Sequence, residues 1–221
     1  MASRLLILGA GGHARAVADL VDACGMSVAG FTDRSARPGV IGTDADLPAL
    51  ARAGRIDAAV VGVGNTALAR RAELFALVKA AGVDAPALVH PRAVLSPSCR
   101  IGAGAAVFPS VLGADVTVGD NAVIYSGVVA EHDCRVGAHA YVAPGAILSG
   151  SVVVEEGAFV GAGAVILPGV VVGAGAVVGA GAVVTASVRA GVTVVGIPAR
   201  ASAPAATPRV EPVSREEVDA P

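Results

Sequence analysis

The dominant pattern in the sequence is an apolar residue at every sixth position from residue 112 to residue 184. The members of this series are Leu112, Val118, Ile124, Ala130, Val136, Val142, Leu148, Val154, Val160, Ile166, Val172, Val178 and Val184. Gly or another small residue often follows, and a second small or β-branched residue often falls four positions later. A period of six fits neither the 3.6-residue turn of an α-helix nor the alternation of a single strand. The pattern predicts a parallel β-helix of short strands with apolar side chains stacked in a narrow interior.

Three ionisable residues, Glu131, His132 and Asp133, directly follow Ala130, the smallest member of the series. A histidine in this setting is a candidate general base, because its unperturbed pKa lies near neutral pH. The alternative is a surface histidine on the wall of the coil. Neighbouring residues on a regular strand point to opposite faces, so Asp133 reaches His132 only if the backbone bends there or through a neighbouring coil. His139, in a plain repeat, is expected to face solvent, and the alternative is a role at an interface.

The repeat is out of step at its beginning. Ile101 and Val107 are in step with each other but one residue out of step with Leu112. We therefore expect the turn between Pro109 and Gly113 to absorb the slip.

The first ninety residues follow a different pattern, in which short apolar runs alternate with segments of helical spacing. The run at residues 4–8 predicts a strand, residues 15–24 a helix and residues 27–31 a second strand. A third strand is expected at residues 58–64 and a second helix at residues 67–81. Such an alternation of strand and helix predicts a parallel α/β domain.

The turn after the first strand, Gly9-Ala-Gly-Gly-His-Ala14, fits the G-x-G-x-x-G/A fingerprint of dinucleotide-binding folds. Backbone N–H groups of Gly11 and Gly12 at a helix start can bind a phosphate, and Asp33 can accept hydrogen bonds from a ribose or base. Ninety residues have room for half of a doubly wound domain, which favours a mononucleotide or nucleotide-sugar over NAD. The alternative is a tight structural turn. For His13, ligand binding and simple helix entry are both open.

Composition narrows the functional classes. The chain of 221 residues is 54% hydrophobic and 15% charged, with 29 Gly and no Trp, as expected for a solenoid core of Val, Ile, Leu and Ala. A net charge of −2 without a basic run argues against a nucleic-acid surface. Residues 157–188 carry no charge, but their glycines, Pro168 and six-residue register argue against a membrane span. The start lacks a signal peptide and the 3 cysteines lack metal-type spacing, which favours a cytoplasmic protein without a metal.

In combination, these motifs resemble the hexapeptide-repeat sugar O- and N-acyltransferases, the family of the sialic acid O-acetyltransferase NeuD and the UDP-4-amino-sugar acetyltransferase PglD. The segments that carry the resemblance are the glycine turn, the repeats, Glu131–Gly137, Val142–Ala146, Leu148–Gly150 and Val195–Arg200. The resemblance implies a nucleotide-sugar-binding half-Rossmann domain over residues 1–90 and a left-handed β-helix over residues 91–200. Residues 201–221, rich in Ala, Pro and Glu, are then expected to form a disordered tail.

The same resemblance implies a homotrimer with active sites between neighbouring coils. The implied reaction is direct acetyl transfer from acetyl-CoA to the amino group of a UDP-linked 4-amino-sugar. His132 matches the family's catalytic base, and Asp133 matches the acidic neighbour that raises its basicity. Positions matching those that hold the nucleotide are Gly11, Gly12, His13, Asp33 and Gly64. Positions matching the coenzyme A groove are Tyr141, Ala162 and Ala180, with the Gly150 N–H as a candidate donor to the thioester oxyanion.

Two of the matched positions depart from the family pattern. Tyr141 stands where the family commonly has His, although a phenol can still donate a hydrogen bond to acetyl-CoA. Arg34 stands beside the nucleotide site where the family has a second acidic residue. We expect Arg34 to influence which base or sugar is bound.

Three other functions are compatible with the sequence. A sugar O-acetyltransferase of the sialic acid type fits the same repeats, since the residue pattern does not separate amine from hydroxyl acceptors. A γ-type carbonic anhydrase shares the architecture but uses three histidines at a metal, and His132 and His139 alone do not supply them. A non-catalytic, nucleotide-binding trimeric scaffold is the third, and it predicts that His132→Ala leaves function intact.

Overall fold

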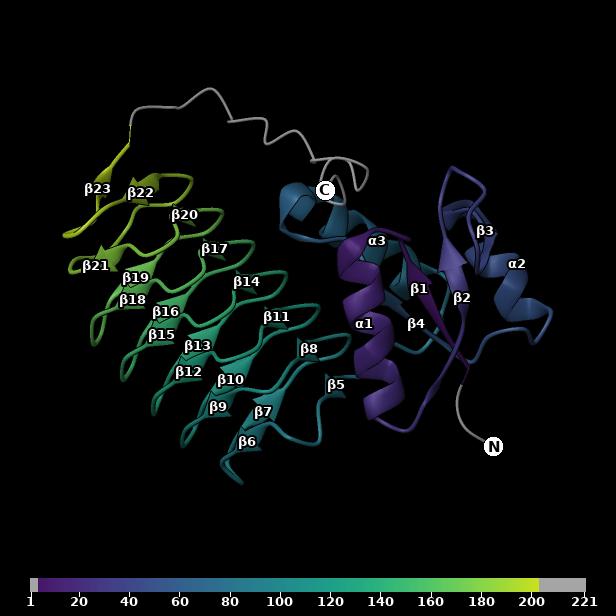
Figure 1. Cartoon of the computed structure of the whole chain (residues 1–221), viewed down its shortest axis with the longest axis horizontal. Helices are drawn as coiled ribbons and strands as arrows, with labels where there is room; N and C mark the ends of the chain where they lie inside the picture. Colours follow the sequence, from purple (N-terminus) through teal and green to yellow (C-terminus); the bar gives the residue numbers. More distant parts are fainter. Residues whose placement is uncertain (1–3, 203–221) are drawn as a thin grey trace, which may run out of the picture.

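The computed structural model describes residues 4–202, which form an α/β domain packed against a long three-sided coil (Figure 1). The α/β domain contains a four-stranded parallel sheet in the order β3-β2-β1-β4. Its strands are β1 (Arg4–Leu8), β2 (Ser27–Thr32), β3 (Val40–Gly42) and β4 (Ala58–Val61). Its helices are α1 (Gly12–Ala23), α2 (Leu47–Arg52) and α3 (Leu68–Ala80), with 3-10 turns η1 (Asp44–Asp46) and η2 (Asn65–Ala67). This strand order is that of one half of a Rossmann fold, as predicted.

The helices cover both faces of this sheet because each buries one apolar stripe. Helix α1 buries Ala14, Val17, Leu20 and Val21 and packs in one cluster with the outer face of the coil. Helices α2 and α3 cover the opposite face, where Leu50 and Leu74 pack with Leu6 and Leu8 of β1. The coil therefore packs against α1, and it also contacts α3, where Arg71 donates hydrogen bonds to Asn121 of the coil (Figure 1).

The coil consists of three sheets of short strands, one sheet on each side of a triangular cross-section, and all strands are parallel except β23, which pairs antiparallel with β22. The inter-domain sheet holds β5 (Leu88–Val89), β8 (Ala106–Val107), β11 (Val123–Ile124), β14 (Tyr141–Val142), β17 (Phe159–Val160), β20 (Val177–Val178), β22 (Thr193–Val195) and β23 (Arg200–Ala201). The aliphatic sheet holds β6 (Val94–Leu95), β9 (Val111–Leu112), β12 (Val129–Ala130), β15 (Ile147–Leu148), β18 (Val165–Ile166) and β21 (Val183–Val184). The arginine sheet holds β7 (Arg100–Ile101), β10 (Thr117–Val118), β13 (Arg135–Val136), β16 (Val153–Val154) and β19 (Val171–Val172).

The second residue of each of these strands from β9 to β21 belongs to the six-residue series, and every member of that series is buried. The predicted period therefore corresponds to one strand and one corner. The expected slip is also present, because three residues join β8 to β9 where four join the neighbouring strands. Strand β5 pairs with β8, so the coil begins just before the predicted boundary at residue 91. The predicted tail lies outside the described residues, apart from its first two positions.

The corners of the coil follow a second six-residue series with left-handed backbone. Every sixth residue from Asp115 to Gly181 has φ between +54° and +74°. Most of these residues are Gly, which adopts this conformation without a steric penalty. The exceptions are Asp115, Asn121, Asp133, His139 and Ser151. Asn, Asp and His are the non-glycine residues most often found there, so these corners form without requiring Gly.

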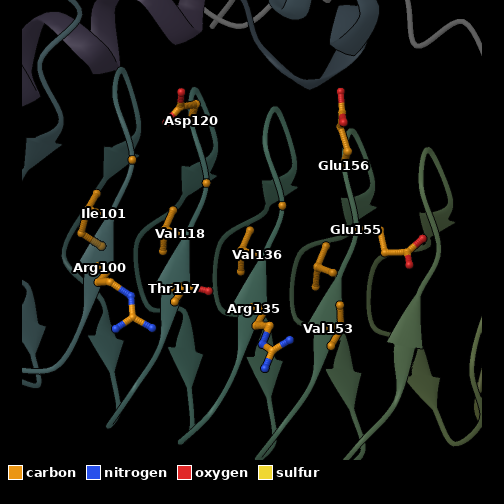
Figure 2. Close-up of a pocket in the computed structure, with 14 residues that line it drawn as sticks. Arg100, Ile101, Thr117, Val118, Asp120, Arg135, Val136, Val153, Glu155 and Glu156 are labelled. Atoms are coloured by element: carbon orange, nitrogen blue, oxygen red, sulfur yellow. The ribbon is translucent and has the colours of Figure 1, made fainter.

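The outer faces of the three sheets differ. On the inter-domain sheet Val123 and Tyr141 are buried under the α/β domain. The aliphatic sheet is uncovered and presents one apolar side chain from each strand, namely Val94, Val111, Val129, Ile147, Val165 and Val183. The arginine sheet presents Arg100, Thr117 and Arg135 from its first strands (Figure 2).

Candidate active site

His132 and Asp133 lie at the corner between β12 and β13, where the aliphatic and arginine sheets meet. The Nδ1 atom of His132 is 2.8 Å from Oδ2 of Asp133, and both side chains are well exposed, at 62% and 59%. This contact between sequence neighbours forms because Asp133 has a φ of +62°, which bends the chain at that point. The first of the two routes expected from the sequence, a local backbone bend, is therefore the one that occurs.

Gly150 occupies the equivalent corner on the next coil and lies against the His132 ring. A Cβ atom at residue 150 would lie 2.6 Å from Nε2 of His132. The corner is held by a hydrogen bond from the Ser151 N–H to the His132 carbonyl oxygen, at 2.8 Å. The Gly150 N–H has no acceptor among residues 4–202, so it is free to donate to a ligand. The predicted base and oxyanion donor are therefore neighbours.

The glycine turn of the α/β domain lines a cavity of about 410 Å³ at the carboxyl ends of β1 and β4. Its wall contains the predicted nucleotide positions Gly11, Gly12, His13, Asp33 and Gly64. Helix α1 begins at Gly12 and has no side-chain cap, so its first N–H groups are free to meet an anion. This is the position at which open α/β sheets bind their ligands.

An adjoining cavity of about 310 Å³ is lined by Arg34 together with Asp33, Thr32, Asp44 and Arg70. Asp44 is already paired, since it accepts hydrogen bonds from the Thr32 hydroxyl and from Arg70. Asp33 accepts a hydrogen bond from the Ser35 N–H at 2.9 Å. The exposed Arg34 has no ion-pair partner within the described chain. Arg34 is thus placed where a nucleotide base or sugar can reach it.

His13 lies between the 410 Å³ cavity at the glycine turn and the coil. Its ring centroid is 5.7 Å from that of Tyr141, 5.9 Å from that of Tyr125 and 6.5 Å from that of Phe108. Neither ring nitrogen has a hydrogen-bond partner. Burial, and then the positive charge of Arg71, lower the pKa of His13 to about 3, so the imidazole is neutral at physiological pH.

The three residues matched to coenzyme A contacts occupy one side of the coil. Ala162 and Ala180 are exposed at successive corners between the inter-domain and aliphatic sheets, and the Ala162 carbonyl accepts the Gly181 N–H at 2.8 Å. Tyr141 is 6% exposed and packs beneath the α/β domain. The small corner residues leave room for an extended ligand along this edge. His132, by contrast, lies at the other edge of the aliphatic sheet.

A groove of about 510 Å³ runs over the arginine sheet and was not expected from the sequence. Figure 2 shows Arg100, Thr117 and Arg135 on its lower side and Asp120 and Glu156 at its upper end. It contains none of the predicted site residues. The six-residue series describes only inward positions, so it gave no signal for this outer face.

The sequence also missed a buried polar cluster between the two domains. Arg71 is 1% exposed and donates hydrogen bonds to Asn121, which in turn contacts Nδ1 of His139 at 2.9 Å. His139 is half-buried beside Phe75, so the expectation that it faces solvent was wrong. Asn121 and His139 replace Gly in the left-handed corner series, but Asp115, Asp133 and Ser151 do so as well, so the series alone does not identify this cluster.

The described residues contain no group of three or more His, Cys, Asp or Glu side chains placed to hold a metal ion. His132 and His139 lie at opposite ends of the segment containing β13. No helix within residues 4–202 is long and apolar enough to cross a membrane.

Three family matches agree with this division of the chain. Residues 4–75 match the PglD N-terminal domain, residues 73–160 match the GMPPB C-terminal domain, and residues 151–186 match six bacterial transferase hexapeptide repeats. No curated protein sequence gives a significant match.

Solved structures give matches over nearly the whole chain. PerB from Caulobacter crescentus, in complex with CoA and GDP-perosamine, is 39% identical with a TM-score of 0.86, covering 90% of this chain and 97% of PerB. The acetyltransferase domain of PglB from Neisseria gonorrhoeae, in complex with acetyl coenzyme A, is 33% identical with a TM-score of 0.84, covering 91% and 100%. WeeI from Acinetobacter baumannii is 29% identical with a TM-score of 0.79, covering 90% and 99%. The coil is therefore a left-handed β-helix, as predicted.

Proposed function

Since this chain belongs to the PglD family of hexapeptide-repeat acyltransferases that use coenzyme A, we propose that it acetylates the amino group of a nucleotide-linked 4-amino-sugar. The observation that carries the proposal is the His132–Asp133 pair, with Nε2 of His132 beside the free N–H of Gly150. The nucleotide cavity at the glycine turn supplies the second half of the site. Acetyl-CoA is the acyl donor.

His132 acts as the general base in this proposal. An Asp133 carboxylate can only accept a hydrogen bond, so it holds the proton of the neutral imidazole on Nδ1 and leaves the Nε2 lone pair free. The amine attacks the carbonyl carbon of the acetyl thioester while Nε2 takes one of its protons. The carbon–sulfur bond then breaks, and the proton passes from His132 to the departing thiolate. The products are an acetamido sugar and free coenzyme A.

Negative charge develops on the thioester oxygen as the amine adds. A backbone N–H placed in advance stabilises such an oxyanion better than water does, because it does not have to reorient. The Gly150 N–H is free and lies next to the base. Direct transfer follows, since no Ser or Cys side chain within residues 4–202 has the setting of an activated nucleophile.

We infer a homotrimer in which the aliphatic sheets face one another. Val94, Val111 and Ile147 are 63%, 45% and 41% exposed on one continuous face. Contiguous apolar surfaces of this kind mark protein–protein contacts. A second copy of this chain is the occupant favoured by the family, whose members are expected to be trimers.

This assembly would also complete the active site. His132 and Gly150 lie at one edge of the aliphatic sheet, whereas Ala162 and Ala180 lie at its other edge. The nucleotide cavity belongs to the α/β domain, which covers the adjoining inter-domain sheet. In a closed head-to-tail ring, the first edge of one copy meets the second edge of the next. The base would then come from one copy, and the nucleotide-sugar from its neighbour.

The test measures thiol release from acetyl-CoA by wild type and His132→Ala, with UDP-linked and GDP-linked 4-amino-sugars and free sialic acid as acceptors. We expect turnover on a nucleotide-linked amine, reduced about 10²- to 10⁴-fold in the variant. His90→Ala is the matched control, because His90 follows β5 in the first coil and its ring accepts a hydrogen bond from the nearby Arg92 N–H. Turnover on sialic acid alone would favour the O-acetyltransferase, and full activity of His132→Ala would contradict the assigned base.

A further inference from the structure

Arg71 of α3 is a buried cation without an acidic partner. Its Nη1 donates to the Val63 carbonyl oxygen, and its Nη2 donates to the backbone and side-chain oxygens of Asn121, at 2.8 and 3.1 Å. The ring centroid of Tyr141 lies 6.0 Å from its Cζ atom. No carboxylate in residues 4–202 lies within ion-pair distance of the guanidinium.

Burying a guanidinium without an acidic partner lowers the stability of the folded protein. A buried charge that lacks an opposite charge loses its hydration without full compensation, and its Nε atom has no hydrogen-bond partner. Burial lowers the pKa of Arg71 only to about 10, so the side chain is charged at neutral pH. An apolar side chain of similar volume would cost less free energy to bury at this position. The presence of a charged side chain therefore indicates that its charge has a functional role.

The contact with Val63 connects Arg71 to the nucleotide cavity. Val63 belongs to the loop Gly62–Asn65, which lines that cavity and lies against the glycine turn, since a Cβ at Gly9 would lie 3.2 Å from Cγ2 of Val63. The loop also packs closely against α1, because a Cβ at Gly62 would lie 2.9 Å from Cβ of Ala14. Arg71 restrains the loop from another direction through its hydrogen bond to the Val63 carbonyl oxygen. The charge also acts at the cavity wall, because it contributes to the lowered pKa of His13.

The coil holds Arg71 in place through Asn121. Asn121 is fully buried at a corner with φ of +54°, and its Nδ2 donates to the Arg71 carbonyl oxygen at 3.2 Å. The same Nδ2 lies 2.9 Å from Nδ1 of His139. Burial lowers the pKa of His139, which favours a neutral ring that accepts this hydrogen bond. The loop of the α/β domain is thereby connected to two corners of the coil.

We propose that Arg71 is a positioning residue for the nucleotide-sugar, holding the loop Gly62–Asn65 and supplying a buried positive charge that complements the diphosphate. The proposal rests on the proposed function, because it assumes that the cavity binds a nucleoside diphosphate. Binding of the diphosphate supplies the opposite charge that the chain itself lacks. Asn121 and His139 are the coil residues that fix the position of this charge.

The experiment measures dissociation constants for UDP, GDP and the corresponding nucleosides, using the full chain without acetyl-CoA. In Arg71→Met we expect diphosphate binding to weaken about 10-fold while nucleoside binding changes little, because only the diphosphate carries charge. Arg71→Lys keeps the charge and should recover part of the affinity. Arg52→Met removes an exposed arginine of α2 and should leave both affinities within about twofold of wild type.

A second variant neutralises the charge without removing the guanidinium. Asn121→Asp has the same size, tolerates the left-handed corner and places a carboxylate against the guanidinium, although it loses the hydrogen bond from Nδ2 to the Arg71 carbonyl oxygen. We expect it to keep a cooperative unfolding transition while diphosphate affinity falls as in Arg71→Met. Equal weakening of nucleoside and diphosphate, or unchanged diphosphate binding in both variants, would overturn the proposal. Failure of the wild type to bind any nucleoside diphosphate would overturn the proposed substrate class as well, which distinguishes the two failures.

Discussion

The lack of a side chain at Gly150 leaves space for the imidazole of His132, because a Cβ there would lie 2.6 Å from Nε2. The backbone of Gly150 is not in the left-handed region, so its identity is set by this neighbour and not by the turn. Residue 150 is therefore a glycine because the His132 ring, on the preceding coil, occupies the space that a side chain would need.

Gly150→Ala should displace the His132 ring. The ring is exposed and can rotate away, so the change should lower kcat about 10- to 100-fold with little effect on thermal unfolding. Steady-state kinetics with saturating acetyl-CoA and amino-sugar would measure this. Ser149→Ala, at the neighbouring position, is the control and should retain activity. An active Gly150→Ala enzyme would contradict a tight fit between residue 150 and the base.

Asp133→Asn should inactivate the base without disturbing its position. Asn tolerates the φ of +62° at this corner, but its amide can donate to Nδ1 and so favour the tautomer that carries its proton on Nε2. We expect kcat to fall about 10²-fold or more. An unchanged rate would mean that Asp133 does not act on His132.

His13 should make the fold sensitive to acid. Its pKa is lowered to about 3 in the folded protein, below the ordinary value of 6.5, so between these values the unfolded chain binds more protons. Stability is therefore complete above about pH 6.5 and falls as the pH decreases toward 3, by up to about 1.4 kcal/mol per pH unit.

Urea unfolding of wild type and His13→Phe at pH 7, 6 and 5 would measure this contribution. Phe has a similar ring and suits the aromatic surroundings, but it does not titrate. We expect the pH dependence of the free energy of unfolding to be smaller in the variant. Identical dependence in both proteins would show that His13 is not buried as a neutral ring.

Ile147→Lys should disrupt the proposed trimer. Ile147 is 41% exposed at the middle of the aliphatic sheet, so a lysine there would place charge in a closely packed contact. Light scattering after size-exclusion chromatography should report a smaller particle, and activity should be lost with it. Val153→Lys makes the same change on the outer face of the arginine sheet and should remain trimeric. A trimeric Ile147→Lys protein would place the contact elsewhere.

Two inactive variants should restore activity when they assemble together. If His132 and the nucleotide cavity of one site come from different copies, mixed trimers of His132→Ala and Asp33→Ala contain some intact sites. Random assembly at equal amounts gives about a quarter of sites intact. Co-expression of the two chains and measurement of thiol release would test this. Activity no greater than that of either variant alone would indicate a site built within one chain.

Much of the fold could be read from local patterns. The six-residue series required an inward side chain from each strand, and the buried residues from Leu112 to Val184 follow it. The strand and helix pattern around Gly9–Ala14 likewise predicted the half-Rossmann domain. The slip after Val107 could be placed because a single missing residue shifts every later position of a strict repeat.

Other features depended on contacts between distant parts of the chain. The sequence indicated neither the cation at Arg71 nor the half-buried state of His139, because both depend on how the α/β domain packs against the coil. Tyr141 was read as part of the coenzyme A groove, but the same packing buries it beside His13. Its predicted contact with acetyl-CoA stays a prediction.

The sequence by itself determined the repeat, the corners and the identity of the candidate base, since a solenoid is stabilised mainly by contacts between adjacent coils. Only the tertiary structure decided which groups meet. It turned Asp133 toward His132 through a left-handed corner, placed Gly150 against the ring, and formed a cavity at the glycine turn of the α/β domain. These relationships depend on backbone direction and on domain packing, which spacing along a chain does not encode.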